Sequence, residues 1–208
     1  MLSQRFGASE FQALTSVSRE TLQQFESYAD HLLRWSKAMN LVSRDSLDDL
    51  WRRHFWDSAQ LLPLLPATEG ERLVIADLGS GAGFPGMVLA ILQAGEMHLI
   101  EADRKKAVFL REVARDLKLE VRIHAQRIEA IPGPFADVVT ARALAPLDRL
   151  ASYAQAVLKD GGKALFLKGQ GVDRELTLLP EPERMIIEQF PSRSDPSGMI
   201  LRIGGLVA

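Results

Sequence analysis

The chain has 208 residues, a formal net charge of -2, 47% hydrophobic residues and no cysteine. This size allows one core plus an appended subdomain, and a mean hydropathy of -0.01 without a long apolar run argues against a membrane span. The absence of cysteine excludes disulfides and thiolate nucleophiles. The four histidines do not have the spacing of metal ligands, so no metal site is predicted. Residues 1–7 lack the apolar stretch of a signal peptide, so we expect a cytoplasmic protein.

Residues 1–66 are predicted to form a helical N-terminal subdomain. A loose arm or short helix comes first, and Ser18 is then placed to cap a helix. Apolar residues recur there at steps of three, four and seven, namely Leu22, Phe25, Ala29, Leu32 and Met39. Ser46 to Asp49 has the pattern of a capping box, which predicts a second helix through Leu62. Two prolines at 63 and 66 end it, so we place the second domain at 67–208.

Strands and helices alternate from residue 67 onward. Strands are expected at 73–76, 97–101, 121–124, 136–140 and 163–167, with helices near 86–93, 104–117 and from Pro146 to the glycine signal at 160–162. Two later apolar runs, 185–187 and 199–203, are expected to close the sheet as an antiparallel hairpin. The alternation predicts an α/β fold with a doubly wound, mostly parallel, seven-stranded sheet.

The most informative segment is Ile75 to Gly86, in which an apolar strand runs into Asp77 and then into glycines 79, 81 and 83. Glycine allows a tight turn and lets a ligand approach the backbone. The segment therefore predicts a strand, a ligand-binding loop and a helix, at the place where open α/β sheets bind nucleotide-like ligands.

The type of ligand follows from the two acids that flank this loop. Residues 81–86 also fit the dinucleotide pattern G-x-G-x-x-G, which alone is a weak signal. Asp77 would repel a pyrophosphate, and it suits the positively charged S-adenosylmethionine better. Glu101 ends the next strand, where a carboxylate can bind ribose hydroxyls. We therefore predict S-adenosylmethionine as cofactor and keep an NAD-dependent oxidoreductase as an alternative.

Further motifs carry a more specific resemblance over residues 18–205. They are Asn40 to Ser43, His54 to Ser58, Gly83 to Gly86, Ala141 to Ala145 and Leu167 to Gln170. Together they resemble the bacterial guanine-N7 methyltransferases of small-subunit (16S) ribosomal RNA, also called the glucose-inhibited division protein B family. The resemblance implies a class I methyltransferase fold with a helical cap, S-adenosylmethionine as methyl donor, and a guanine of 16S ribosomal RNA or of the small ribosomal subunit as acceptor.

The motif and the resemblance together give a set of expected cofactor-binding residues. These are Asp77, Gly79, Gly81, Gly83, Phe84, Glu101, Ala102, Ile128, Glu129 and Arg142. The resemblance implies that Ile128 and Glu129 meet the adenine, although Glu129 alone would suggest only a solvated acid. Arg142 follows the fourth strand on the ligand side of the sheet and is expected to bind the cofactor carboxylate or an RNA phosphate, with a surface ion pair as the alternative.

No acid–base catalyst, nucleophile or metal is expected, because the N7 lone pair of guanine needs no deprotonation. The candidates for positioning the substrate are Arg142, Lys168, His54 and Asn40. Lys168 is equally consistent with a solvent-facing lysine, and His54 with a buried pair to Asp57 that fixes the cap.

Basic clusters at 52–53 and 104–106 are candidate RNA contacts. A methyltransferase of proteins or small molecules and a non-catalytic RNA-binding module remain alternatives. Among oligomeric states, a monomer is favoured.

Overall fold

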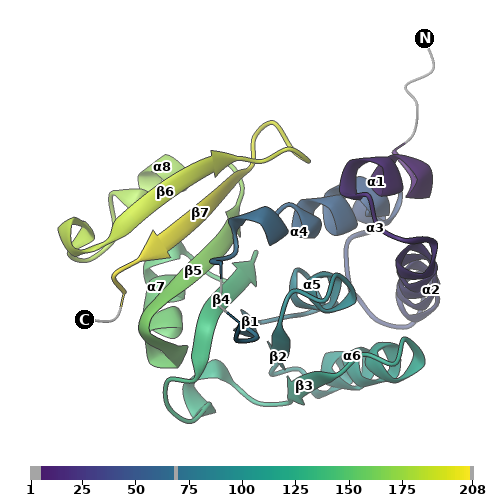
Figure 1. Cartoon of the computed structure of the whole chain (residues 1–208), viewed down its shortest axis with the longest axis horizontal. Coiled ribbons are helices and arrows are strands. Elements are labelled where there is room, and N and C mark those ends of the chain that lie inside the picture. Colours follow the sequence, from purple (N-terminus) through teal and green to yellow (C-terminus); the bar gives the residue numbers. More distant parts are fainter. Residues whose placement is uncertain (1–5, 68–69, 207–208) are drawn as a thin grey trace.

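The computed structural model describes residues 6–67 and 70–206, which build one seven-stranded sheet (Figure 1). The strands are β1 (Val74–Leu78), β2 (Glu96–Ile100), β3 (Val121–His124), β4 (Ala136–Arg142), β5 (Leu158–Lys168), β6 (Ile186–Pro191) and β7 (Met199–Gly204). Their order is β3-β2-β1-β4-β5-β7-β6, parallel from β3 to β5 and antiparallel at β7 and β6. Strands are added to one side of β1 as β2 and β3 and then to its other side as β4 and β5. The predicted doubly wound fold and its closing hairpin are therefore confirmed.

Helices cover both faces of this sheet. They are α1 (Ala8–Thr15), α2 (Arg19–Trp35), α3 (Arg44–Leu47), a π-helical segment (Trp51–Trp56), α4 (Asp57–Ala59), α5 (Gly86–Ile91), α6 (Arg104–Asp116), α7 (Leu147–Val157) and α8 (Val172–Leu176). Short 3-10 turns occupy Leu62–Leu64, Ile128–Ala130 and Pro182–Arg184. Figure 1 shows α5, α6 and the N-terminal helices on one side of the sheet and α7 with α8 on the other.

Two of the predicted helix starts are fixed by side-chain caps. The Ser18 hydroxyl accepts a hydrogen bond from the Thr21 N–H and begins α2, as the sequence predicts. Asp103 begins α6 in the same way, because its carboxylate accepts from the backbone N–H groups of Lys105 and Lys106. Both caps satisfy donors that a helix start leaves without partners.

The N-terminal helices share a hydrophobic core with one face of the sheet. Phe11, Phe25 and Phe55 are fully buried and pack edge-on or tilted against one another, with ring centroids 4.7 to 6.3 Å apart. Every residue of α5 is buried, because this helix lies between the sheet and the N-terminal helices. This arrangement explains why α5 is apolar all round rather than on one stripe. The domain boundary after residue 66 stays a prediction, and residues 68–69 lie outside the described part.

Two local predictions are wrong. Ser46 does not begin a helix, because it lies inside α3 and its hydroxyl donates to the Ser43 carbonyl. The helical stretch that follows is divided into the π-helical segment, α4 and a 3-10 turn. Nor does the glycine pair at 161–162 end α7. That helix ends at Val157, and β5 starts at Leu158, whose side chain is fully buried and whose backbone pairs with Ala136. Burial of Leu158 outweighs the local turn signal, and a register shift between Ala136 and Val138 accommodates the extra residues.

Candidate active site

A cavity of about 440 Å³ lies at the carboxyl ends of β1, β2 and β4, the edge at which such sheets bind ligands. Its volume is within the range of about 300 to 1,000 Å³ that is usual for small-molecule sites. The predicted cofactor residues that line it are Gly79, Gly81, Phe84, Glu101, Ala102, Ile128, Glu129 and Arg142. Asp77 and Gly83, the other two predicted cofactor residues, do not line this cavity.

Asp77 is fully buried beneath the glycine-rich loop. Its Oδ1 accepts a hydrogen bond from the Thr140 hydroxyl at 2.8 Å, and Gly86 packs directly against its side chain. Burial raises the pKa of Asp77 to about 6, although hydrogen bonds from Ser80 and Thr140 act in the opposite direction. In this structure Asp77 joins β1, β4 and the start of α5.

Gly83 connects the loop to the N-terminal helices. Its φ of +97° favours glycine, and an added Cβ would lie 2.4 Å from the Tyr28 hydroxyl oxygen and 2.8 Å from the Met87 Cβ. The Tyr28 hydroxyl in turn donates to the Ala82 carbonyl at 2.5 Å. The third glycine of the motif is therefore required for packing between the loop and α2.

Glu101 lies at the end of β2, with both carboxylate oxygens held by backbone donors. Its Oε2 accepts from the Gly81 N–H and its Oε1 from the Asp103 N–H, each at 2.7 Å. A carboxylate oxygen has more than one lone pair, so both oxygens can still accept from a ligand. The carboxylate is therefore fixed in orientation and faces a cavity that also contains the glycine loop.

The far end of the cavity combines an apolar side chain with an exposed acid. Ile128 is buried, whereas the Glu129 side chain is 48% exposed and its Oε1 accepts from the Tyr153 hydroxyl. Lys106 also lines this cavity, while its neighbour Lys105 is exposed on the first turn of α6. The predicted basic cluster of 104–106 therefore includes one residue that faces the cofactor cavity.

A second cavity, of about 670 Å³, adjoins the first. Val42, Arg142 and Ala143 line both. The second cavity also contains basic side chains from Arg52, Arg53 and Lys168, and carboxylates from Asp49, Asp57, Glu175 and Asp195. Its wall is completed by the loop between β6 and β7, so segments from both ends of the chain form it.

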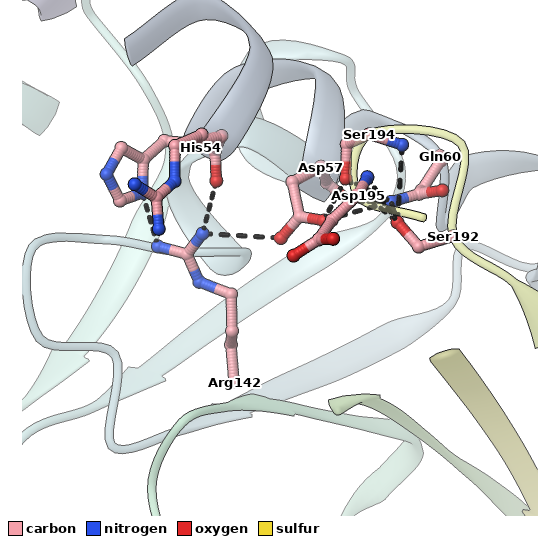
Figure 2. Close-up of polar contacts among 8 residues, drawn as sticks. His54, Asp57, Gln60, Arg142, Ser192, Ser194 and Asp195 are labelled. Carbon is pink, nitrogen blue, oxygen red and sulfur yellow. Dashed lines mark hydrogen bonds and ion pairs between the residues drawn. The ribbon is translucent and has the colours of Figure 1, made fainter. Parts of the chain in front are cut away.

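Arg142 stands between the two cavities and is held by three acceptors. Its Nη1 donates to the Arg53 carbonyl at 2.9 Å and to Asp57 Oδ2 at 3.3 Å, and its Nη2 donates to His54 Nδ1 at 2.7 Å (Figure 2). The guanidinium also lies 4.8 Å from the centre of the Phe84 ring. Burial lowers the pKa of Arg142, and the Asp57 carboxylate counteracts this effect.

His54 cannot act as a base at neutral pH in this arrangement. Arginine only donates hydrogen bonds, so Nδ1 of His54 is the acceptor and the ring proton is on Nε2. Burial, together with the charges of Arg142 and Arg53, lowers the pKa of His54 to about 3. The ring is stacked on Phe84, with centroids 4.7 Å apart. His54 therefore orients Arg142 as a neutral side chain, and it lines the second cavity.

The remaining two positioning candidates lie apart from each other. Lys168 lines the second cavity, where its Nζ is 2.7 Å from Glu175 Oε2 and donates to the Ala145 carbonyl at 3.2 Å. Asn40 is exposed and lines neither of the two cavities; it belongs to a shallow groove formed by residues 36–47.

Sequence reasoning missed several residues that shape these cavities. Leu41 lines the cofactor cavity from the loop after α2, and Leu144 does so from the loop after β4, where it covers Gly79. An added Cβ on Gly79 would lie 2.5 Å from Leu144 Cδ1. Ala143, with a φ of +50°, occupies the left-handed region that non-glycine residues rarely adopt. Leu41 and Leu144 lie within the motifs Asn40 to Ser43 and Ala141 to Ala145, but as apolar loop residues they give no sign that they line a cavity.

Within residues 6–67 and 70–206, His, Asp and Glu side chains form no group suited to a metal ion. Over the same ranges, no helix combines the length and the apolar character required to cross a bilayer.

Comparison with known proteins assigns the family. Residues 21–194 match the family described as rRNA small subunit methyltransferase G. The chain belongs to this family. Proteins named ribosomal RNA small subunit methyltransferase G from Rhodospirillum centenum and Rhodospirillum rubrum are 54% and 53% identical to it. These alignments cover 95% and 93% of this chain and 90% and 95% of the relatives. The family and enzyme class expected from the sequence are confirmed, and the oxidoreductase alternative is set aside.

The fold is also found in solved structures with little sequence similarity. A mutant of MtNAS in complex with S-adenosylmethionine superposes with a TM-score of 0.58 at 15% identity, over 98% of this chain and 85% of that one. At this identity the likeness concerns the fold alone, and it agrees with the class I methyltransferase fold predicted from the sequence.

Proposed function

We propose that this protein transfers a methyl group from S-adenosylmethionine to N7 of a guanine in 16S ribosomal RNA, as the free RNA or within the small ribosomal subunit. The observation that supports it best is the pair of adjoining cavities that share Arg142 at the carboxyl edge of the sheet. One cavity has the features of a cofactor site, and the other has space and charge for a nucleotide. The family assignment supports the choice of ribosomal RNA.

The residues of the first cavity fit S-adenosylmethionine. Glu101 offers a fixed carboxylate for the ribose hydroxyls, and Ile128 offers an apolar surface for the adenine. Gly79 and Gly81 leave the backbone open to the methionine part. When bound, S-adenosylmethionine supplies an activated methyl group on a sulfonium, which is a good leaving group. We retain Asp77 and Gly83 as supports of the loop, since neither faces this cavity.

The second cavity fits an unpaired guanosine. N7 lies on the major-groove edge of the base, which A-form RNA hides in a deep and narrow groove, so the target base has to be splayed out. Arg52 and Arg53 can neutralise backbone phosphates at this cavity. The carboxylates there can accept from the N1 and N2 donors of guanine, which adenine does not have.

The chain's own contribution to the reaction is alignment and exclusion of water. Nδ1 of His54 is already occupied by Arg142, and a pKa of about 3 makes His54 a weak base, so neither residue removes a proton. None has to be removed, because N7 carries a free lone pair. Arg142, Phe84 and His54 form one packed unit between the cavities and orient both ligands from there.

The proposal includes a monomer that acts in the cytoplasm. Both cavities are built from one chain, so no second copy is required to complete the site.

The decisive experiment uses methyl-labelled S-adenosylmethionine and small-subunit ribosomal RNA that lacks the modification, supplied either free or in assembled subunits. After digestion, the label should be found in N7-methylguanosine from one site. Arg142→Ala should abolish transfer. The matched control is Arg184→Ala, in the turn before β6, whose side chain pairs with Glu181 and lines neither cavity; it should transfer at the wild-type rate.

Three outcomes would contradict the proposal. Label in a protein or small molecule and not in RNA would favour a different substrate class. Binding of RNA without any transfer would favour a non-catalytic RNA-binding module. Label at another atom of the guanine would refute the assignment to N7.

A further inference from the structure

The loop between β6 and β7 is fastened to the N-terminal helices by side chains. Figure 1 shows this loop extending from the sheet toward those helices. Gln60 Oε1 accepts from the Arg193 N–H at 2.8 Å, and Gln60 Nε2 donates to the Ser192 hydroxyl at 3.1 Å. Trp56 Nε1 donates to the Arg193 carbonyl at 3.4 Å. The loop and the helices thus meet beside the second cavity, which Asp57, Ser192 and Ser194 line.

Asp57 links this loop to Arg142. Its Oδ1 accepts from the Ser194 hydroxyl at 2.5 Å and from Gln60 Nε2 at 3.1 Å, and its Oδ2 accepts from Arg142 Nη1 at 3.3 Å (Figure 2). Both oxygens of one carboxylate are therefore engaged, with the loop on one side and with the guanidinium on the other. The side chains of Asp57 and Arg142 are 16% and 17% exposed, so solvent only partly screens their interaction.

Arg142 depends on Asp57 more than on its other two partners. The Arg53 carbonyl and His54 are uncharged acceptors, and Asp57 supplies the one negative charge among the three. All three bonds have a charged donor, but only the Asp57 carboxylate adds a charge–charge attraction, which still acts at 3.3 Å. The position of the guanidinium between the cavities therefore follows the orientation of the Asp57 carboxylate.

We propose that Asp57 and Ser194 are positioning residues through which the β6–β7 loop sets the place of Arg142 for methyl transfer. Ser194 acts through Asp57 and makes no essential contact of its own with either ligand. The inference rests on the proposed function, since methyl transfer is the reaction that it concerns.

Ser194 can be tested without detaching the loop. Removal of its hydroxyl also ends its contacts with the Ser192 hydroxyl at 2.8 Å and with Gln60 Nε2 at 3.3 Å. It leaves the bonds of Gln60 and Trp56 to Arg193 in place, and Arg193 still stacks on Trp56 at 5.2 Å. Ser194→Ala should lower kcat about tenfold, the effect of one lost hydrogen bond to a charged group. Because Arg142 borders the first cavity, kcat is measured at saturating S-adenosylmethionine. The unfolding midpoint should fall by only a few degrees, as expected for the loss of one hydroxyl. Ser194→Thr keeps a hydroxyl and should restore most of kcat.

The matched control lies in the same loop. Ser197→Ala removes a hydroxyl that bonds only to Asp195 within the loop, and it should leave kcat unchanged. Asp57→Asn keeps the size of the side chain but removes its charge. We expect it to lower kcat by about 100-fold, the scale of a misplacement of about 1 Å at a reacting centre.

The double variant shows whether Ser194 acts through Asp57. If it does, Ser194→Ala adds no further loss in the Asp57→Asn background, so the double variant matches Asp57→Asn alone. Losses that multiply would show an independent role for Ser194 and overturn the inference. A wild-type kcat for Ser194→Ala at saturating S-adenosylmethionine would overturn it too. If the wild type methylates no RNA, the proposed function fails and the inference falls with it.

Discussion

The carboxylate of Glu101 offers a direct test of the cofactor site. Glu101→Gln keeps the size of the side chain but replaces one acceptor oxygen by an NH₂ donor. That NH₂ would face either the Gly81 or the Asp103 N–H, each of which now donates to the carboxylate at 2.7 Å. One charged hydrogen bond is lost and the remaining acceptor is neutral.

The magnitude follows from the bonds that the charged carboxylate is proposed to accept from the ribose hydroxyls. A hydrogen bond to a charged group contributes about 1.5 to 3 kcal/mol. The Kd for S-adenosylmethionine should therefore rise about 10- to 150-fold. Isothermal titration calorimetry with the intact protein measures this directly. Glu96→Gln at the opposite end of β2, where the acid pairs with Arg122 and His98, is the control and should leave the Kd unchanged.

A Kd for Glu101→Gln within twofold of the wild type would refute the reasoning. In that case Glu101 would only brace the loop. A raised Kd together with a lowered unfolding midpoint calls for Glu101→Asp, which keeps the charge but cannot reach both backbone donors.

Three further predictions concern packing and protonation. Gly83→Ala should lower the unfolding free energy by about 2 to 4 kcal/mol, because the new Cβ would lie against Tyr28 and Met87. The thermal unfolding midpoint should fall by at least about 5 °C. An unchanged midpoint in calorimetry would contradict this prediction. The folded pKa of Asp77, about 6, exceeds the ordinary 3.8. The contribution of Asp77 to stability is therefore present below about pH 4 and is lost as the pH rises to about 6. Over that window, urea unfolding should show the unfolding free energy of Asp77→Asn rising by about 2 to 3 kcal/mol relative to wild type, with no further change above it. Since His54 is neutral above about pH 3, the pH profile of kcat between pH 5.5 and 8.5 should have the same shape in His54→Ala as in the wild type. If the wild-type profile has a titration step that is absent in His54→Ala, His54 is an acid–base group.

The regular part of the fold can be predicted because its signals are local. The strands around the glycine-rich loop are short apolar runs, and Ser18 and Asp103 occupy cap positions that depend only on the next few residues. Parallel pairing then brings the ends of β1, β2 and β4 to one edge, so Glu101 and Arg142 meet at the same cavity.

Local sequence signals fail where burial against residues far away in the sequence determines the structure. The glycines at 161–162 have the pattern of a helix end, but pairing of β5 with β4 extends the strand through them. The contact of Asp57 with Ser194 joins residues 137 positions apart, and a serine in a polar loop carries no sign of it. Gly83 belongs to a ligand motif, yet its neighbours in space are Tyr28 and Met87. Which glycine of the motif faces the ligand is therefore set by the helices packed over the loop.

The position of Arg142 on the border of both cavities has a consequence for inhibitors. A compound bound in either cavity that displaces the guanidinium alters the neighbouring cavity as well. By thermodynamic reciprocity, the factor by which RNA changes the affinity for such a compound equals the factor by which the compound changes the affinity for RNA. Inhibitors of the first cavity that contact the guanidinium should therefore be ranked with RNA present as well as with the protein alone.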